Sequence, residues 1–263
     1  MIKIKNVLSI AAFFLTVAGI AACEKNTLRT TETLSATDKA YTKFYFLSPG
    51  TPSVMIKIND VKINGSNTSG FGGVFPANVL FPDYSATTPG GSIKMSLPNV
   101  GTSNDSVVIF SGTLPTAANK FYSVTLADTG VDRTLFTIED PVGDITDSGF
   151  YKLRFINAMG KSPAVSIVRI DSASATVVTR DTIIKNIVFK SASDFVRVPV
   201  SARNAFYRYR MIVSTTGASF GTNLTPTQGT IINQRYVTLY AGGFVNGTVA
   251  PFLPVLSVLV YNK

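Results

Sequence analysis

Four carboxylates lie close together in the middle of the chain, where residues 138–149 read I-E-D-P-V-G-D-I-T-D-S-G. Glu139, Asp140, Asp144 and Asp147 offer the oxygen ligands that calcium takes, although their spacing matches no calcium-binding loop pattern. Glycoside hydrolysis also uses a pair of carboxylates, at a separation that sequence proximity does not set. We favour the simpler interpretation, a solvated acidic linker, and predict no metal site and no catalytic residue.

Two residue types that often carry catalysis are missing or nearly so, because the chain has no histidine and a single cysteine, Cys23. Serine-histidine and cysteine-histidine nucleophile systems are therefore excluded, as are zinc and copper sites built on imidazole or thiolate ligands. Tryptophan is also absent, which argues against a wide aromatic platform for sugars. The sequence predicts a non-catalytic protein without a cofactor. The alternative is a carbohydrate-active enzyme or its glycan-binding accessory protein.

A long connection from Asn64 to Gly90 is rich in Gly, Ser, Asn and Pro, yet it contains aromatic residues. Loops of this length are uncommon unless they have a role. The candidate ligand-binding residues of this loop are Phe71, Phe75, Phe81 and Tyr84. These rings either line a binding site at one end of the first sandwich or fold down over an open edge of its core. Deep burial of the rings would favour the second interpretation.

Basic residues outnumber acidic ones, with 24 Lys and Arg against 15 Asp and Glu. They are dispersed along predicted strands and form no run of the kind that binds nucleic acid, so no nucleic-acid partner is predicted. Five arginines in the second half either share one sheet face, where they would bind an acidic glycan or phosphate, or are ordinary outward-facing strand residues. We favour the second interpretation for Arg154, Arg169, Arg197, Arg208 and Arg210.

The first 22 residues resemble a bacterial lipoprotein signal peptide. Lys3 and Lys5 precede an apolar segment from Val7 to Ala22, which ends in I-A-A-C at residues 20–23 and so resembles a lipobox. We expect residues 1–22 to be removed and Cys23 to carry the lipid that anchors the protein to a membrane. A retained transmembrane anchor is the alternative, but this segment is shorter than the roughly 20 apolar residues that span a bilayer.

Residues 23–40 are polar and lack apolar periodicity, so we expect a lipidated, flexible tether, with an irregular first strand as the alternative. From Lys43 onward, short alternating runs recur about every ten residues between Gly, Pro, Asn and Ser turns, which predicts an all-β chain. Strands are expected at 42–47, 53–63, 91–97, 106–113, 121–127, 133–139, 150–157, 165–171, 194–200, 205–214, 236–241 and 255–261. Within F-Y-R-Y-R-M-I-V, we expect Tyr207, Tyr209, Met211 and Val213 to face the core.

The two halves of this region resemble each other. The segment K-F-Y-F-L-S from Lys43 aligns with K-L-R-F-I-N from Lys152, and N-K-F-Y-S-V-T-L-A from Asn119 aligns with N-Q-R-Y-V-T-L-Y-A from Asn233. A repeat of about 110 residues has the size of one small β-sandwich. We therefore predict two tandem antiparallel β-sandwich domains, residues 41–147 and 148–263, that meet between Glu139 and Gly149.

The stretch L-R-F-I-N-A-M-G-K-S-P-A-V-S-I from Leu153 to Ile167 resembles the opening signature of the repeats called domain of unknown function 4397. The closing Q-R-Y-V-T-L-Y-A-G-G resembles the last motif of that family. In the first copy, Tyr45 replaces the arginine and Ser48 the asparagine. The resemblance implies immunoglobulin-like sandwiches in a lipoprotein of Bacteroidota, and it brings no established activity or catalytic residue.

The combined prediction is an envelope lipoprotein that acts as a non-catalytic binding or scaffolding module for an envelope protein or glycan. Glu24, after the lipidated cysteine, is not the aspartate that retains lipoproteins in the inner membrane, which favours the outer membrane. The segment E-K-N leaves both the periplasmic and the outer leaflet open.

Overall fold

A computed structural model describes residues 38–64, 70–76, 84–98, 105–140, 145–172, 178–200, 207–224, 234–248 and 253–261. Asp38–Lys263 form one compact unit. The predicted signal peptide, Cys23 and the predicted tether up to Thr37 lie outside the described residues. Phe81 and Asp144 do as well.

The first half of the compact unit forms a β-sandwich, here called the first sandwich. Its inner sheet has the order β4-β1-β8-β9 with β5 also on β1, and its outer sheet has the order β3-β2-β6-β7. The strands are β1 (Ala40–Phe46), β2 (Met55–Ile58), β3 (Val61–Lys62), β4 (Val74–Phe75), β5 (Ser85–Thr87), β6 (Ser92–Pro98), β7 (Asp105–Thr113), β8 (Phe121–Ala127) and β9 (Thr134–Asp140), with the short 3₁₀ helix η2 (Gly130–Asp132) before β9.

The second half forms a second sandwich from nine further strands. Its inner sheet has the order β13-β10-β17-β18 with β14 also on β10, and its outer sheet has the order β12-β11-β15-β16. The strands are β10 (Phe150–Asn157), β11 (Val165–Ser172), β12 (Val178–Ile187), β13 (Ser191–Ala192), β14 (Val196–Pro199), β15 (Arg208–Val213), β16 (Ser219–Leu224), β17 (Tyr236–Gly242) and β18 (Val255–Tyr261). Strands β1 to β9 thus correspond in order and pairing to β10 to β18.

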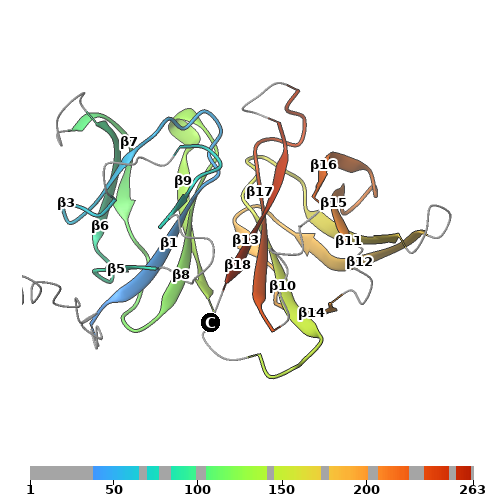
Figure 1. Ribbon diagram of the computed structural model, residues 1–263. Helices are drawn as coiled ribbons and strands as arrows, with labels where there is room; N and C mark the ends of the chain where they lie inside the picture. The colour runs from blue at the N-terminus through green and yellow to red at the C-terminus, as the bar shows by residue number, and fades with distance from the viewer. Residues whose placement is uncertain are drawn as a thin grey trace, which may run out of the picture. The chain divides into compact units, whose positions relative to one another are not determined.

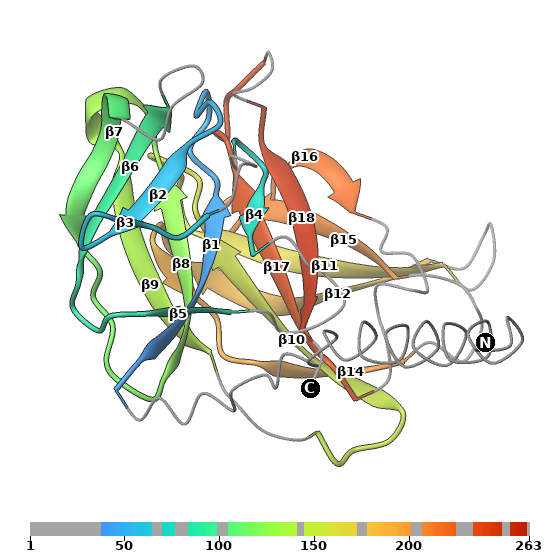
Figure 2. The ribbon, with the colours of Figure 1, turned by 60° about the vertical axis from the view of Figure 1, so that its left-hand side comes forward.

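The predicted fold class, an all-β chain of two tandem sandwiches, is confirmed (Figures 1 and 2). One detail differs from a purely antiparallel sandwich, because β1 pairs with β8 in parallel and β10 pairs with β17 in parallel. A parallel pair needs a long crossover, and here the crossover contains the whole outer sheet of each sandwich. The first and last parts of each repeat therefore meet in one inner sheet.

Alternation along each inner strand sends one set of side chains into the sandwich and the other set out of it. In β10, Tyr151, Leu153 and Phe155 belong to the core of the second sandwich, whereas Arg154 and Ile156 face the other way. Of the four predicted core residues, Tyr207, Tyr209 and Met211 are buried in the same core, as predicted, whereas Val213 is half-buried. The first sandwich has its own core between β1, β2, β6 and β8.

The pairing register corrects one of the sequence alignments by one residue. Phe44 lies beside Val124, and its counterpart Leu153 lies beside Val237. Val124 thus corresponds to Val237 and Thr125 to Thr238, so the V-T-L triplets of β8 and β17 coincide. The ungapped alignment from Asn119 placed Val124 against Thr238, one residue away, because Val124 follows Asn119 by five residues and Val237 follows Asn233 by four.

Candidate functional site

The two inner sheets meet through the faces that point away from their own cores, and this contact is here called the junction. It contains a separate buried cluster with members from both sandwiches. In this cluster the rings of Tyr45 and Tyr240 meet edge to face, with centroids 5.4 Å apart. The other buried members are Leu47, Ala127, Phe136, Ile156 and Ala158. The layers therefore run from outer sheet to inner sheet, across the junction, and on to the second inner and outer sheets (Figure 1).

An ion pair lies at the polar centre of the junction. Arg154 of β10 pairs with Asp140 of β9, and both side chains are almost fully buried, with 2% and 3% exposed. The same guanidinium donates from Nη2 to Ser123 Oγ at 3.0 Å and from Nε to Thr238 Oγ1 at 2.9 Å. Because a buried arginine retains its charge, these contacts compensate the loss of its hydration.

Asp140 collects further donors from the first sandwich. Tyr84 donates its hydroxyl to Asp140 Oδ2 at 2.8 Å, and Ser123 Oγ lies 3.0 Å from both carboxylate oxygens. The carboxylate therefore connects the loop before β5, the strands β8 and β9, and, through Arg154, the second sandwich. This network fixes the position of one sandwich against the other.

Backbone also approaches closely across the junction at two glycines. A Cβ on Gly160 would lie 2.7 Å from Asp128 Oδ1, and a Cβ on Gly242 would lie 3.2 Å from the Cβ and the carbonyl oxygen of Leu47. Asp128 and Leu47 belong to the first sandwich, and the glycines to the second. A larger residue at either position would require Asp128 or Leu47 to move.

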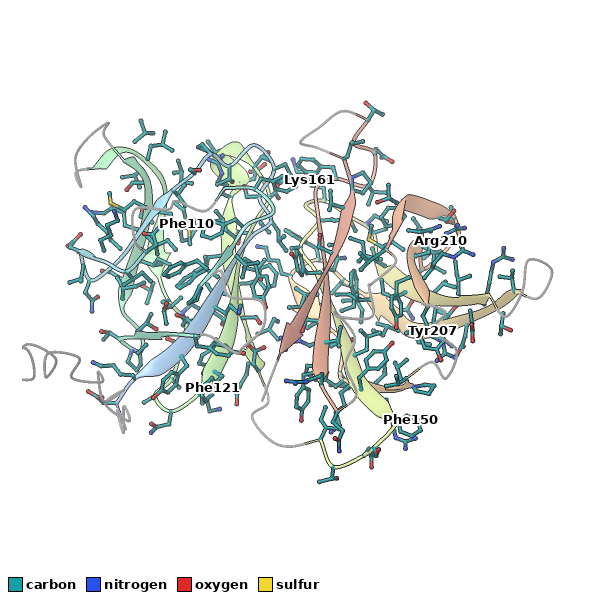
Figure 3. The ribbon with its side chains drawn as sticks, in the orientation of Figure 1. Phe110, Phe121, Phe150, Lys161, Tyr207 and Arg210 are labelled. Atoms are coloured by element: carbon teal, nitrogen blue, oxygen red, sulfur yellow. The ribbon has the colours of Figure 1, made fainter. Side chains whose placement is uncertain are left out.

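Half-buried rings continue from the ion pair to the ends of the inner strands. In the first sandwich, Tyr41 stacks on Phe121 at 4.6 Å and Tyr84 meets Phe121 edge to face at 5.0 Å. In the second sandwich, the Arg154 guanidinium lies 4.9 Å from the Phe195 ring, which meets Tyr236 edge to face at 5.0 Å. Figure 3 shows Phe121 and Phe150 near the starts of β8 and β10.

The candidate residues of the 64–90 loop take structural positions where they are described. Phe75 in β4 lies opposite Phe44, with ring centroids 6.3 Å apart, and packs against the first core. Tyr84 packs at the junction and bonds Asp140. Phe71 is half-buried, and its backbone N–H donates to Thr51 O at 3.0 Å. These contacts favour core cover for Phe75 and Tyr84, whereas Phe81 lies outside the described residues.

The central carboxylates do not form the solvated linker that we expected. Asp140 is buried, which the sequence could not indicate because its partner Arg154 lies beyond the linker. Glu139 pairs with Lys120 at 2.7 Å, and this hydrogen bond raises the pKa of the lysine. Asp147 accepts from Arg197 Nε at 3.0 Å. Within the described ranges, no group of three His, Cys, Asp or Glu residues is placed to hold a metal ion.

The five arginines neither share one face nor all point outward. Arg154 and Arg197 belong to the inner sheet, and Arg154 is buried. The remaining three belong to the outer sheet, where Arg169 lies opposite Tyr209, while Arg208 and Arg210 lie on the other face. The interpretation of Arg154 as an ordinary surface residue was therefore wrong, because junction contacts replace its hydration.

A buried tyrosine pair connects the two sheets of the second sandwich. The hydroxyl groups of Tyr151 in β10 and Tyr209 in β15 are hydrogen-bonded to each other. Burial raises the pKa of Tyr151 and of Tyr209 well above the ordinary value for tyrosine. Both hydroxyl groups stay neutral at physiological pH, so the pair holds the two sheets together and does not act as an acid or a base.

No family model matches the chain and no curated protein matches it, so the resemblance to domain of unknown function 4397 stays a prediction. The fimbrial anchor protein Mfa2 from Porphyromonas gingivalis aligns with a TM-score of 0.30 and 9% identity over 84% of this chain and 97% of that one. A candidate cell adhesion protein from Bacteroides uniformis aligns with a TM-score of 0.26 and 8% identity over 84% and 96%. Similarity this weak carries no functional conclusion.

The described residues contain no helix that is long and apolar enough to cross a membrane.

Proposed function

We propose that the protein is an envelope lipoprotein, anchored at Cys23 in the outer membrane, and that its two sandwiches form a non-catalytic module that binds or scaffolds another envelope protein or glycan. The observation that carries this proposal is the junction. Domains joined by small polar interfaces move relative to each other by default. Here an apolar cluster and a buried Arg154–Asp140 pair join the sandwiches, so their outer surfaces keep a fixed separation, as a scaffold requires.

The anchoring part of the proposal rests on the sequence I-A-A-C at residues 20–23. It is tested by growing cells with a clickable fatty acid and comparing wild type with Cys23→Ala. We expect label and membrane association in wild type, and no label in the variant, which should be soluble in the periplasm or retain its signal peptide. Label that persists in Cys23→Ala would contradict lipidation, because the chain has no other cysteine.

The binding part is tested by chemical crosslinking in intact cells, followed by purification of the lipoprotein and identification of the attached component. A strain that does not produce the lipoprotein serves as the control, because any component recovered from it is background. We expect one envelope component to be enriched with wild type. Failure to enrich any envelope component over this control would contradict a scaffolding role.

The non-catalytic part is tested by incubating the purified protein with envelope polysaccharides and measuring new reducing ends. We expect none, because Glu139, Asp140 and Asp147 each lie against a lysine or arginine. A general acid or base needs a carboxyl group that can give a proton to the substrate or accept one from it. Release of reducing ends that scales with protein concentration would favour the carbohydrate-active enzyme instead.

A further inference from the structure

The start of the second inner sheet carries two cations side by side among aromatic rings. Lys152 of β10 and Arg197 of β14 are registered directly opposite each other, and Lys152 is registered with Tyr236 of β17 on its other side. Directly opposite residues of neighbouring strands share one face, with Cβ atoms about 5 Å apart. We call Phe150, Lys152, Phe195, Arg197 and Tyr236 the ring-cation strip.

Each cation of the strip is held by a ring. The Arg197 guanidinium stacks on the Phe150 ring, 3.1 Å from its centroid, and Lys152 Nζ lies 5.6 Å from the centroid of Tyr236. Tyr236 is in turn supported by Phe195. Stacking fixes the direction of the guanidinium and leaves its N–H edges free of the ring.

The strip has an excess of positive charge. Like charges that lie directly opposite on a sheet repel each other. Asp147 accepts a hydrogen bond from Arg197 Nε. In the described part of the chain, Lys152 forms no ion pair, and its Nζ lies over the Tyr236 ring. Arg197 is exposed, and Lys152, Phe150 and Tyr236 are half-buried, so solvent and ligands reach all four.

We propose that the ring-cation strip binds the carboxylate of an acidic sugar in an envelope glycan. Lys152 and Arg197 would share the carboxylate, which relieves their mutual repulsion, and the C–H edges of the sugar would contact Phe150 and Tyr236. Charge-assisted hydrogen bonds are the stronger class of hydrogen bond, so the carboxylate sets the affinity, while the rings distinguish a sugar from another polyanion. This inference rests on the proposed function, whose glycan partner it specifies.

The test measures binding of the purified full-length lipoprotein, in detergent, to three polymers by calorimetry. Polygalacturonate carries the carboxylate on a sugar, its methyl ester has the same sugar without the charge, and polyglutamate has the charge without the sugar. We expect polygalacturonate to bind at least about tenfold more tightly than either of the other two, the effect of losing one charge-assisted hydrogen bond. Equal binding of all three, or no binding of polygalacturonate, would overturn the proposal.

Variants locate the site. Lys152→Gln/Arg197→Gln should weaken polygalacturonate binding at least about tenfold, as should Phe150→Leu/Lys152→Gln. Lys161→Gln is the matched charge control, because Lys161 is exposed and pairs with Asp132, on the side of the molecule near η2 (Figure 3). Thermal unfolding of each variant checks that it is folded. A Lys161→Gln protein that loses as much affinity as the double variants would show general charge attraction and overturn the site.

Crosslinking in cells separates this inference from the proposed function. If polygalacturonate does not bind but wild type still enriches an envelope component over the strain without the lipoprotein, the sugar site is wrong and the scaffold stands. If neither occurs, both fail. If the component is a glycan and Lys152→Gln/Arg197→Gln no longer enriches it, both are supported.

Discussion

Tyr45 and Arg154 occupy equivalent positions in the two sandwiches, beside Thr125 of β8 and Thr238 of β17, yet they serve the junction differently. Arg154 donates to Thr238 Oγ1 and reaches across to Asp140, whereas the Thr125 hydroxyl is buried without a hydrogen-bond partner. Tyr45 instead contacts Tyr240. The repeats therefore diverge where they meet, because a junction between them needs complementary residues.

The largest effect is expected from breaking this complementarity at Arg154. Arg154→Met leaves Asp140 buried without its cation, so the free energy of unfolding should fall by about 3–5 kcal/mol. Tyr45→Leu, at the same position in the first sandwich, should lower the free energy of unfolding by about 1–2 kcal/mol, because it removes the edge-to-face contact with Tyr240 and leaves no buried charge unpaired. Urea denaturation measures both.

A double variant tests whether the loss of stability comes from the unpaired charge of Asp140. Arg154→Met/Asp140→Leu removes both charges and should recover most of the loss, because apolar residues of similar size often replace a buried ion pair without cost. An Arg154→Met loss no greater than that of Tyr45→Leu would show that the ion pair does not distinguish the two repeats.

The next effect concerns the two glycines of the junction. Gly160→Ala and Gly242→Ala should each lower the free energy of unfolding by about 1–3 kcal/mol, because the new methyl group enters a packed contact with Asp128 or Leu47. Gly112→Ala on the exposed strand β7 is the control, since its Cβ would meet only the Phe110 ring. Equal losses at all three glycines, measured by thermal unfolding, would argue against close contact between the sandwiches.

Alkaline pH should weaken the second sandwich more than the first. Tyr151 and Tyr209 form a buried pair, whereas the equivalent positions of the first sandwich hold Thr42 and Ile93. The folded pKa of each tyrosine is raised, so the proton is held more tightly in the folded state. Their stabilising effect is therefore complete below about pH 10 and declines above it, by up to about 1.4 kcal/mol per pH unit for each group.

Phenylalanine variants test this pH dependence. Tyr151→Phe leaves the Tyr209 hydroxyl without its partner and should lower the free energy of unfolding by about 1–2 kcal/mol at pH 8. Tyr151→Phe/Tyr209→Phe should be closer to wild type at pH 8 and more stable than wild type at pH 11. Denaturation curves at both pH values measure this, and a double variant that loses stability above pH 10 as steeply as wild type would place the alkaline sensitivity elsewhere.

Much of the strand pattern could be predicted from the sequence, and the failures have physical causes. Strands β8, β10 and β18 have the predicted bounds, because each alternates between clear turns. The predicted strand 53–63 is a hairpin of β2 and β3, since Asn59 and Asp60 take positive φ angles of 48° and 63°, as a two-residue turn requires. Strand β12 was missed because it is a largely exposed edge strand with little apolar contrast.

The junction was beyond prediction for a different reason. Arg154 and Asp140 were both noted in the sequence, but as a surface residue and a linker residue. Burial of charge depends on a partner from the other sandwich, and no periodicity within one strand encodes that partner. The only sign in the sequence that Arg154 has a special role was that the first copy holds Tyr45 at the equivalent position.

The smallest effect on stability is expected at two equivalent edge strands, β7 and β16. Their exposed residues differ clearly. β16 is interrupted by Gly221, whose positive φ of 68° departs from extended strand geometry, and its exposed side chains include Thr222 and Asn223. β7 has no charged residue from Ser106 to Thr113, and it exposes Val107 and Val108 by 55% and 49%. Long apolar edge strands pair with further strands unless a charge prevents it.

Val108→Lys should therefore change the free energy of unfolding by less than about 0.5 kcal/mol, because the side chain is exposed, yet reduce self-association of the purified protein. Thr222→Lys adds the same charge to β16, which Gly221 already interrupts, and should therefore leave self-association unchanged. Sedimentation velocity over a range of protein concentrations measures both. If the two lysines suppress association equally, net charge and not the β7 edge controls it, and the two edges do not differ in the way their residues indicate.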